Sequence, residues 1–147
     1  MGKIADLTTN IATKLANDIG DLDADEVIPY RGRDLSTHIN SAIAKTKGVA
    51  VVVAVTSGVN VNEEARRDDI PLRSDNDVSI TVFANPNKGS IEPLDLLEDC
   101  SNALDGMDVF DIGNLETGKQ TLHLVRWDQI SAEQPLHAFE IKCQLRT

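Results

Sequence analysis

Seven consecutive apolar residues, Val49 to Val55, constrain the fold more than any other feature of this chain. The run is rich in valine, whose branched side chain favours strands, and it is short for a helix. Because no position in the run is polar, both faces of such a strand must be covered by other parts of the protein. The run therefore predicts a central strand of a sheet with packing on both sides.

Helical periodicity appears in three other segments. Residues 3–19 place five apolar side chains at steps of three or four, which is the stripe of an amphipathic helix. A second helix is predicted over residues 34–47, with Asp34 as its N-cap, and a third over residues 91–104, with Ser90 as its N-cap. Three helices are thus available to cover the sheet.

Alternation of apolar and polar residues predicts further strands, and two short apolar segments are added to them. The strands and short segments are Val27–Tyr30, Val78–Phe83, Met107–Ile112, Thr121–Trp127 and Leu136–Leu145. Because Pro29 cannot donate a ladder hydrogen bond, the first segment is expected at an edge or a strand end. At 147 residues the chain suits a single domain. We expect an α+β fold: a mostly antiparallel sheet with the helices packed on one face.

The formal net charge of −10 argues against binding to a phosphate backbone or to an anionic membrane surface. Two interpretations of this acidity are open. It either keeps the protein soluble, or it keeps a surface or lumen negative so that DNA does not adhere. No apolar run is long enough for a membrane span, and no signal peptide is expected. Cys100 and Cys143 belong to no CxxC pattern and are expected to be buried, reduced thiols.

Two familiar binding motifs are approached but not completed. Residues 113–119 fit the GxxxxGK part of a P-loop, but Gln120 stands where Ser or Thr must hold Mg²⁺, and a strand rather than a helix is predicted next. Asp21, Asp23 and Asp25 resemble the start of a calcium loop, which then lacks its sixth-position Gly and twelfth-position Glu. We therefore expect a solvated acidic loop at residues 21–26, and no cofactor or metal.

The remaining candidates for chemistry are His38, His123, His137 and Cys100. His123 and His137 are predicted on adjacent strands, where they could approach each other, but two histidines make only half of a zinc site. Cys100 would need a histidine nearby to act as a nucleophile, and its apolar helix favours a place in the core. No catalytic residue is predicted.

The segment from Val59 to Asn76 is long, irregular and highly charged, and such connections tend to be functional or disordered. Arginines beside carboxylates suit bidentate pairing across a subunit contact. The candidate interface residues share this charge and lie close together: Glu63, Glu64, Arg66, Arg67, Asp68, Asp69 and Arg73. The segment is either a solvated loop or an arm, extended or hairpin, that orders against a neighbour.

The order of these elements resembles the tail-terminator and tail-completion proteins of long-tailed bacteriophages, of the minor tail protein U type. The resemblance covers nearly the whole chain. It includes the IEPLDLLEDCSNAL helix and the closing strand pair LHLVRWDQISAEQPLHAFEIKCQLRT, with Arg126, Trp127 and Asp128 in it. The helix predicted at residues 34–47 departs from the better-known members.

This resemblance implies a structural virion protein rather than an enzyme. One tail-terminator-like domain over residues 1–147 would form a ring, usually hexameric, that caps the tail tube and ends its polymerisation. Its partners would be other copies of itself, the tail-tube protein and the head–tail connector or another neck protein. DNA would pass through the lumen without specific binding. Two alternatives are open: another neck or connector component, and a small α+β enzyme or ligand-binding domain that uses His123, His137 or Cys100.

Overall fold

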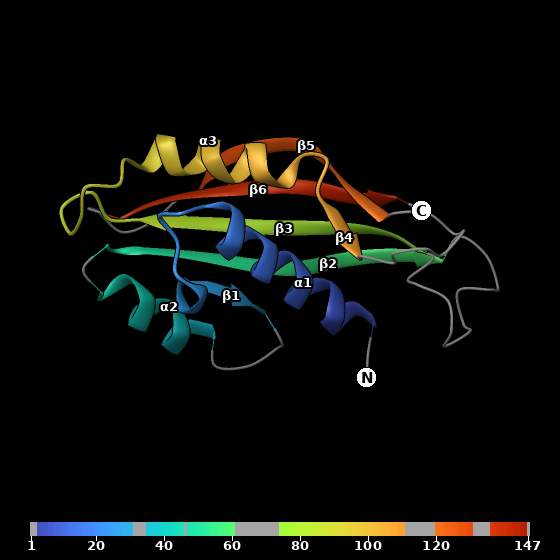
Figure 1. Cartoon of the computed structure of the whole chain (residues 1–147), viewed down its shortest axis with the longest axis horizontal. Coiled ribbons are helices and arrows are strands. Elements are labelled where there is room, and N and C mark those ends of the chain that lie inside the picture. Colours follow the sequence, from blue (N-terminus) through green and yellow to red (C-terminus); the bar gives the residue numbers. More distant parts are fainter. Residues whose placement is uncertain are drawn as a thin grey trace.

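The computed structural model describes residues 3–30, 35–45, 47–60, 74–110, 120–130 and 136–146. Within these ranges the strands form one six-stranded sheet in the order β1-β2-β3-β6-β5-β4 (Figure 1). The strands are β1 (Val27–Pro29), β2 (Val49–Asn60), β3 (Ser74–Ala84), β4 (Asp108–Phe110), β5 (Gln120–Ile130) and β6 (His137–Arg146). Only the β1–β2 pair is parallel among these strands. The expected α+β class and mostly antiparallel sheet are confirmed.

The valine-rich run forms the first part of β2, between β1 and β3. Its side chains alternate between two separate apolar clusters. Val49, Val51 and Val53 belong to the larger cluster, and Ala50 and Val52 belong to the smaller one on the opposite face. The prediction of a strand covered on both faces is confirmed, although β3 and β6 rather than β2 lie in the middle of the sheet.

Two helices cover the face with the larger cluster. They are α1 (Lys3–Asp18) and α3 (Pro93–Leu104), both seen in front of the sheet in Figure 1. The predicted stripe of α1 is buried at Leu7, Ile11 and Leu15, each fully inaccessible to solvent. These side chains pack with those of α3 and of the middle strands, so this face holds most of the core.

The remaining helix, α2 (Leu35–Ile43), lies on the opposite face of the sheet. The expectation that all helices pack on one face is therefore wrong. Ala42 of α2, with Ile39 and Ile43 beside it, packs against the smaller cluster, which includes Ile28 of β1. The reason lies in β2, whose uninterrupted apolar run leaves the second face in need of cover near β1. Beyond α2 the same face is lined by polar side chains.

The limits of two helices differ from those predicted. The second helix ends at Ile43 rather than Lys47, and the chain then turns into β2 through Gly48, which has a φ of 65°. A Cβ at this glycine would lie 2.6 Å from the Cβ of Lys88, so both the conformation and the space require glycine. Helix α3 has Glu92 rather than Ser90 as its N-cap, because a residue before proline avoids the helical region and Glu92 is extended.

The ends of the charged segment are strands, not irregular backbone. Strand β2 continues to Asn60 and β3 begins at Ser74, with Val59 opposite Asp75. Backbone hydrogen bonds hold such a pair together even where the side chains are polar, and hydrophobic alternation does not reveal them. The segment therefore begins and ends as a β-hairpin, and residues 61–73 lie outside the described part of the chain.

Candidate functional site

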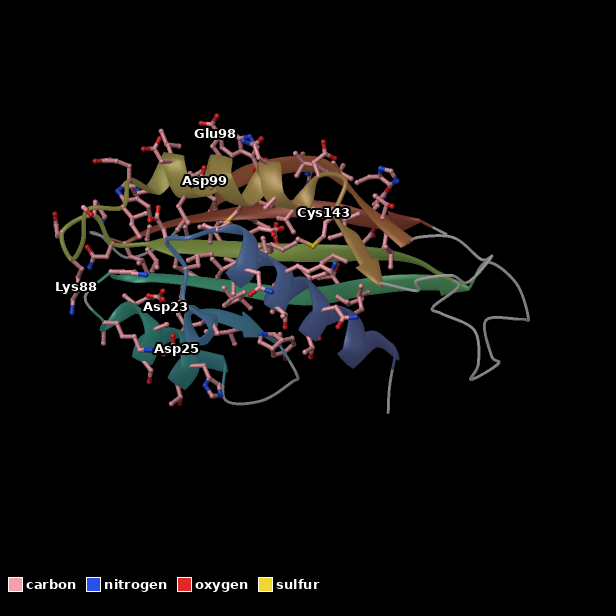
Figure 2. The ribbon with its side chains drawn as sticks, viewed as in Figure 1. Asp23, Asp25, Lys88, Glu98, Asp99 and Cys143 are labelled. Carbon is pink, nitrogen blue, oxygen red and sulfur yellow. The ribbon has the colours of Figure 1, made fainter. Side chains whose placement is uncertain are left out.

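Figure 2 shows Asp23 and Asp25 of the acidic loop, residues 21–26, beside α2. Two lysines that follow α2 join this loop to it. Lys45 pairs with Asp25. The Lys47 ammonium donates to the backbone carbonyl oxygen of Asp21 at 2.9 Å and lies 3.5 Å from the Asp23 carboxylate. The acids of this loop thus bind cationic side chains of the same protein.

One carboxylate of this loop is buried rather than solvated. Glu26 belongs to the short 3₁₀ helix η1 (Ala24–Glu26) and is 1% exposed. Its Oε1 accepts a hydrogen bond from the backbone N–H of Asp23 at 2.8 Å, and the Lys47 ammonium lies 3.8 Å away. The prediction of a solvated loop is wrong at this position, because the hydrogen bond and the lysine together make burial of the carboxylate tolerable.

The P-loop-like residues 113–119 lie outside the described part of the chain. Directly after them β5 begins at Gln120, so a strand follows, as predicted. A P-loop receives phosphate at the N-terminus of the helix that follows it. The continuation of this segment therefore lacks the element that binds phosphate.

The three histidines do not assemble into a site. His38 is exposed on α2. His123 and His137 lie on neighbouring strands as predicted, but His123 is opposite Gln144. His137 lies seven residues from Gln144 along β6, at the far end, roughly 23 Å away for an extended strand. The expectation that these two side chains approach each other is wrong, because register placed them at opposite ends.

The two cysteines are free, buried thiols, as predicted. Cys100 faces the core from α3 and Cys143 from β6, and Figure 2 shows Cys143 between α1 and α3. Burial, together with the nearby charge of Asp99, raises the pKa of the Cys100 thiol to about 12. Burial, together with Asp105, raises the pKa of the Cys143 thiol to about 12 as well. Since the thiolate is the nucleophilic form, neither group suits nucleophilic chemistry at neutral pH.

A polar face of the sheet was not recognised from the sequence. It lies beyond α2 and holds a hollow of about 290 Å³, near the ends of β2 and β3 that lead into the charged hairpin. The side chains that characterise this face are Thr56, Asp77, Ser79, Arg126, Glu140, Lys142 and Gln144. The sequence signal was present in the alternation of β3 and β6, but only the strand register brings the two polar rows together.

The charged side chains of the polar face are engaged with one another. The Ser79 hydroxyl donates to Glu140 Oε2 at 2.8 Å, and the Lys142 ammonium lies 3.8 Å from Glu140 Oε1. On β5, Arg126 Nε lies 3.3 Å from Asp128 Oδ2. In the part of the chain that the structure describes, no three His, Cys, Asp or Glu side chains are grouped to hold a metal ion. The face carries charges of both signs.

The fold resembles a virion protein. A chain from the solved structure of the virion of a native gene transfer agent (GTA) particle superposes with a TM-score of 0.50. The match covers 92% of this chain and 90% of that chain, at 16% sequence identity. Identity this low shows a shared fold and nothing finer. No known protein family and no curated protein matches the sequence.

The predicted interface residues, Glu63, Glu64, Arg66, Arg67, Asp68, Asp69 and Arg73, all lie within residues 61–73, outside the described part of the chain. The structure places the two strands that lead to them, next to the polar face. No helix in the described ranges is both long and apolar enough to cross a membrane. The candidate functional surface is therefore the polar face together with the base of the charged hairpin.

Proposed function

We propose that this chain is a structural protein of a phage-like particle, a tail terminator or tail-completion protein. Copies of it form a ring, most simply a hexamer, that caps the tail tube, ends its polymerisation and joins it to the head connector. The observation that carries the proposal is the fold shared with a GTA virion chain over nine-tenths of both chains. The order of elements in the sequence supports the same assignment.

The chemistry of the described residues also supports a non-enzymatic role. The candidate groups are unsuited to catalysis: both thiols are buried with pKa values of about 12, and His123 and His137 are held apart. Glu140 is engaged by Ser79 and Lys142. A protein that acts by assembly needs surfaces instead, and the polar face and charged hairpin supply them.

The net charge of −10 suits a lumen through which DNA slides without adhering. In this proposal Arg66 and Arg67 of the hairpin pair with carboxylates of a neighbouring subunit or of the tail-tube protein. The mature location is the tail or neck of the virion, after assembly in the host cytoplasm.

The test is to mix the purified chain with tail tubes of the same particle and image the tube ends by electron microscopy. We expect rings on the ends and tubes that stop growing. Arg66→Glu/Arg67→Glu should weaken ring formation at least about tenfold while the thermal midpoint stays within about 2 °C. Arg66→Lys/Arg67→Lys is the matched control, since it keeps the charge but not the bidentate geometry.

Three outcomes would contradict parts of this proposal. A chain that forms no ring and does not bind tubes would exclude the terminator function. Binding to the head connector but not to tube ends would favour another neck component. A biochemical activity that is lost in folded Cys100→Ala or His137→Ala variants would favour the enzyme alternative.

A further inference from the structure

The outer side of β5 is an exposed strand edge. At its start this side is occupied: β4 pairs with Thr121, Leu122 exchanges backbone hydrogen bonds with the Gly106–Met107 turn, and the Leu124 N–H donates to Asp105 Oδ1. From Val125 to Ile130, β6 pairs with the inner side of β5, and no described strand pairs with the outer side. We call this stretch, residues 125–130, the open edge.

Apolar side chains gather on the open edge. Among the described residues five large hydrophobic side chains are exposed, and three of these lie here: Val125 at 54%, Trp127 at 50% and Ile130 at 36%. Trp127 contacts Phe139 edge-on, with ring centroids 6.1 Å apart, and its remaining surface is exposed. An exposed edge with this composition is a site for pairing with another strand.

The charges of β5 do not match those of the strand with which it is paired. Arg126 is opposite Lys142, and Asp128 is opposite Glu140. Like charges directly opposite each other destabilise a strand pair. Inside the monomer Arg126 contacts Asp128 along β5, and Lys142 contacts Glu140 along β6. The charge pattern of β5 is thus unfavourable toward β6.

We propose that the open edge pairs with the open edge of a second copy of this chain, antiparallel and centred on Trp127. In an antiparallel pair, directly opposite side chains lie on the same face of the sheet, whereas neighbouring residues of one strand lie on opposite faces. A two-fold axis that relates the two strands must therefore pass through a residue position and not between two residues. Centring on Trp127 places Arg126 of each copy opposite Asp128 of the other. Centring on either neighbouring residue of β5 places like charges opposite each other. Charge complementarity therefore selects both the occupant and the register.

The same register brings the two Trp127 side chains together. They lie opposite each other on the helix-covered face, where an aromatic pair adds stability to a strand pair. A two-fold contact closes on two copies and cannot by itself form a ring. The proposal is therefore independent of the proposed function: it joins two subunits, or two rings, through one edge.

The experiment measures self-association of the full chain by analytical ultracentrifugation from micromolar to millimolar concentration. The variants are Arg126→Asp, Asp128→Arg and the double exchange. Each single variant should raise the dimer Kd at least about tenfold, because two attractive cross-strand pairs become repulsive. The double exchange should restore the Kd to within about threefold of the wild type. An equimolar mixture of the two single variants should form a heterodimer, because both cross-strand pairs are then between opposite charges.

Two internal controls make the result interpretable. Each single reversal replaces a like-charge pair with β6 by an opposite-charge pair but also removes the Arg126–Asp128 contact along β5, so the stability of the dilute monomer should stay close to that of the wild type. Trp127 is the only tryptophan, so its emission should shift to shorter wavelength as the dimer forms. An unshifted emission at concentrations that give dimer would place the contact elsewhere and overturn the proposal.

Other results would also overturn it. A chain that stays monomeric throughout the concentration range lacks this contact, and so does one whose dimer is unaffected by the single reversals. Variants that lose binding to tail tubes without any wild-type dimer would assign the edge to the tube protein instead. Both single variants could form rings normally and show no rise in the dimer Kd. This result would contradict the present proposal but not the proposed function.

Discussion

The two margins of the sheet differ in how they end. Figure 1 shows β1 along one side of the sheet and β5 near the other. The first margin is three residues long, and its Val27 and Ile28 are buried. The Tyr30 N–H donates to the Val53 carbonyl, toward the inside of the sheet. Because backbone groups alternate along a strand, the nitrogen of residue 29 faces outward. Residue 29 is a proline, which has no N–H to offer there. The second margin is the open edge, longer and half exposed.

This difference indicates that the sheet can be extended from one side only. Short length and proline are the ordinary means of protecting an edge from pairing, and β1 has both. The open edge has neither among residues 125–130. A subunit with two available edges would add copies without limit, whereas a subunit with one is limited to a pair. In the proposed ring we therefore expect no sheet-to-sheet continuation, and we expect the ring contacts to lie on other surfaces.

The largest effect on stability is expected when one valine is replaced at each margin of the sheet. Val27 is 4% exposed within the larger cluster, and Val125 is 54% exposed. Val27→Ala should lower the free energy of unfolding by about 2 kcal/mol, because buried methyl groups are lost and a cavity remains. Val125→Ala should change it by less than about 0.5 kcal/mol. Urea denaturation of dilute protein measures both, and equal losses would show that the two margins are equally packed.

A smaller effect is expected where the acidic loop is joined to α2, beside the β1 margin. Lys47→Met leaves the buried Glu26 carboxylate without its cation and should cost about 1–2 kcal/mol. Lys45→Met is the matched control, since it removes an exposed ion pair with Asp25 and should cost less than about 0.5 kcal/mol. Thermal unfolding at low and high salt measures the loss of stability in each of the two variants. Similar losses in both variants would mean that burial of Glu26 does not depend on Lys47.

The smallest effect on folding should come from opening the protected margin. Pro29→Val restores an outward N–H at the edge and should change stability by less than about 1 kcal/mol. It should nevertheless introduce a new self-association, measurable by light scattering. The measurement compares the double variant Pro29→Val/Arg126→Asp with Arg126→Asp alone. Because Arg126→Asp weakens pairing at the open edge, any further self-association of the double variant comes from the β1 margin. If scattering does not rise, length rather than proline protects β1.

Much of the fold was predictable because burial periodicity is local. The stripe through Leu7, Ile11 and Leu15, the two-sided run at residues 49–55 and the alternation before Leu145 each reveal an element without reference to its neighbours. Each is a pattern that one strand or one helix imposes on its own sequence.

What the sequence did not predict depends on register between distant strands. The separation of His123 from His137, the opposition of Arg126 to Lys142, and the polar face all follow from how β5, β6 and β3 align. Register is set by the whole sheet, and a shift of one residue changes every partner. The face chosen by α2 has the same origin, because it depends on which side of β1 and β2 remains uncovered.

The irregularity in β5 has a consequence for how this strand tolerates change. Leu124 is opposite Cys143 and Arg126 is opposite Lys142, so Val125 is an additional residue that has no partner of its own on β6. It reverses the phase of the strand: Leu122 faces the core before it, and Trp127 takes that face after it. Loss of the single codon for Val125 would place Arg126 directly after Leu124, so β5 would pair with β6 without a bulge and Arg126 and Trp127 would keep their faces. The bulge therefore absorbs one extra residue locally, and deletion of that residue should leave every other partner of β5 on β6 unchanged.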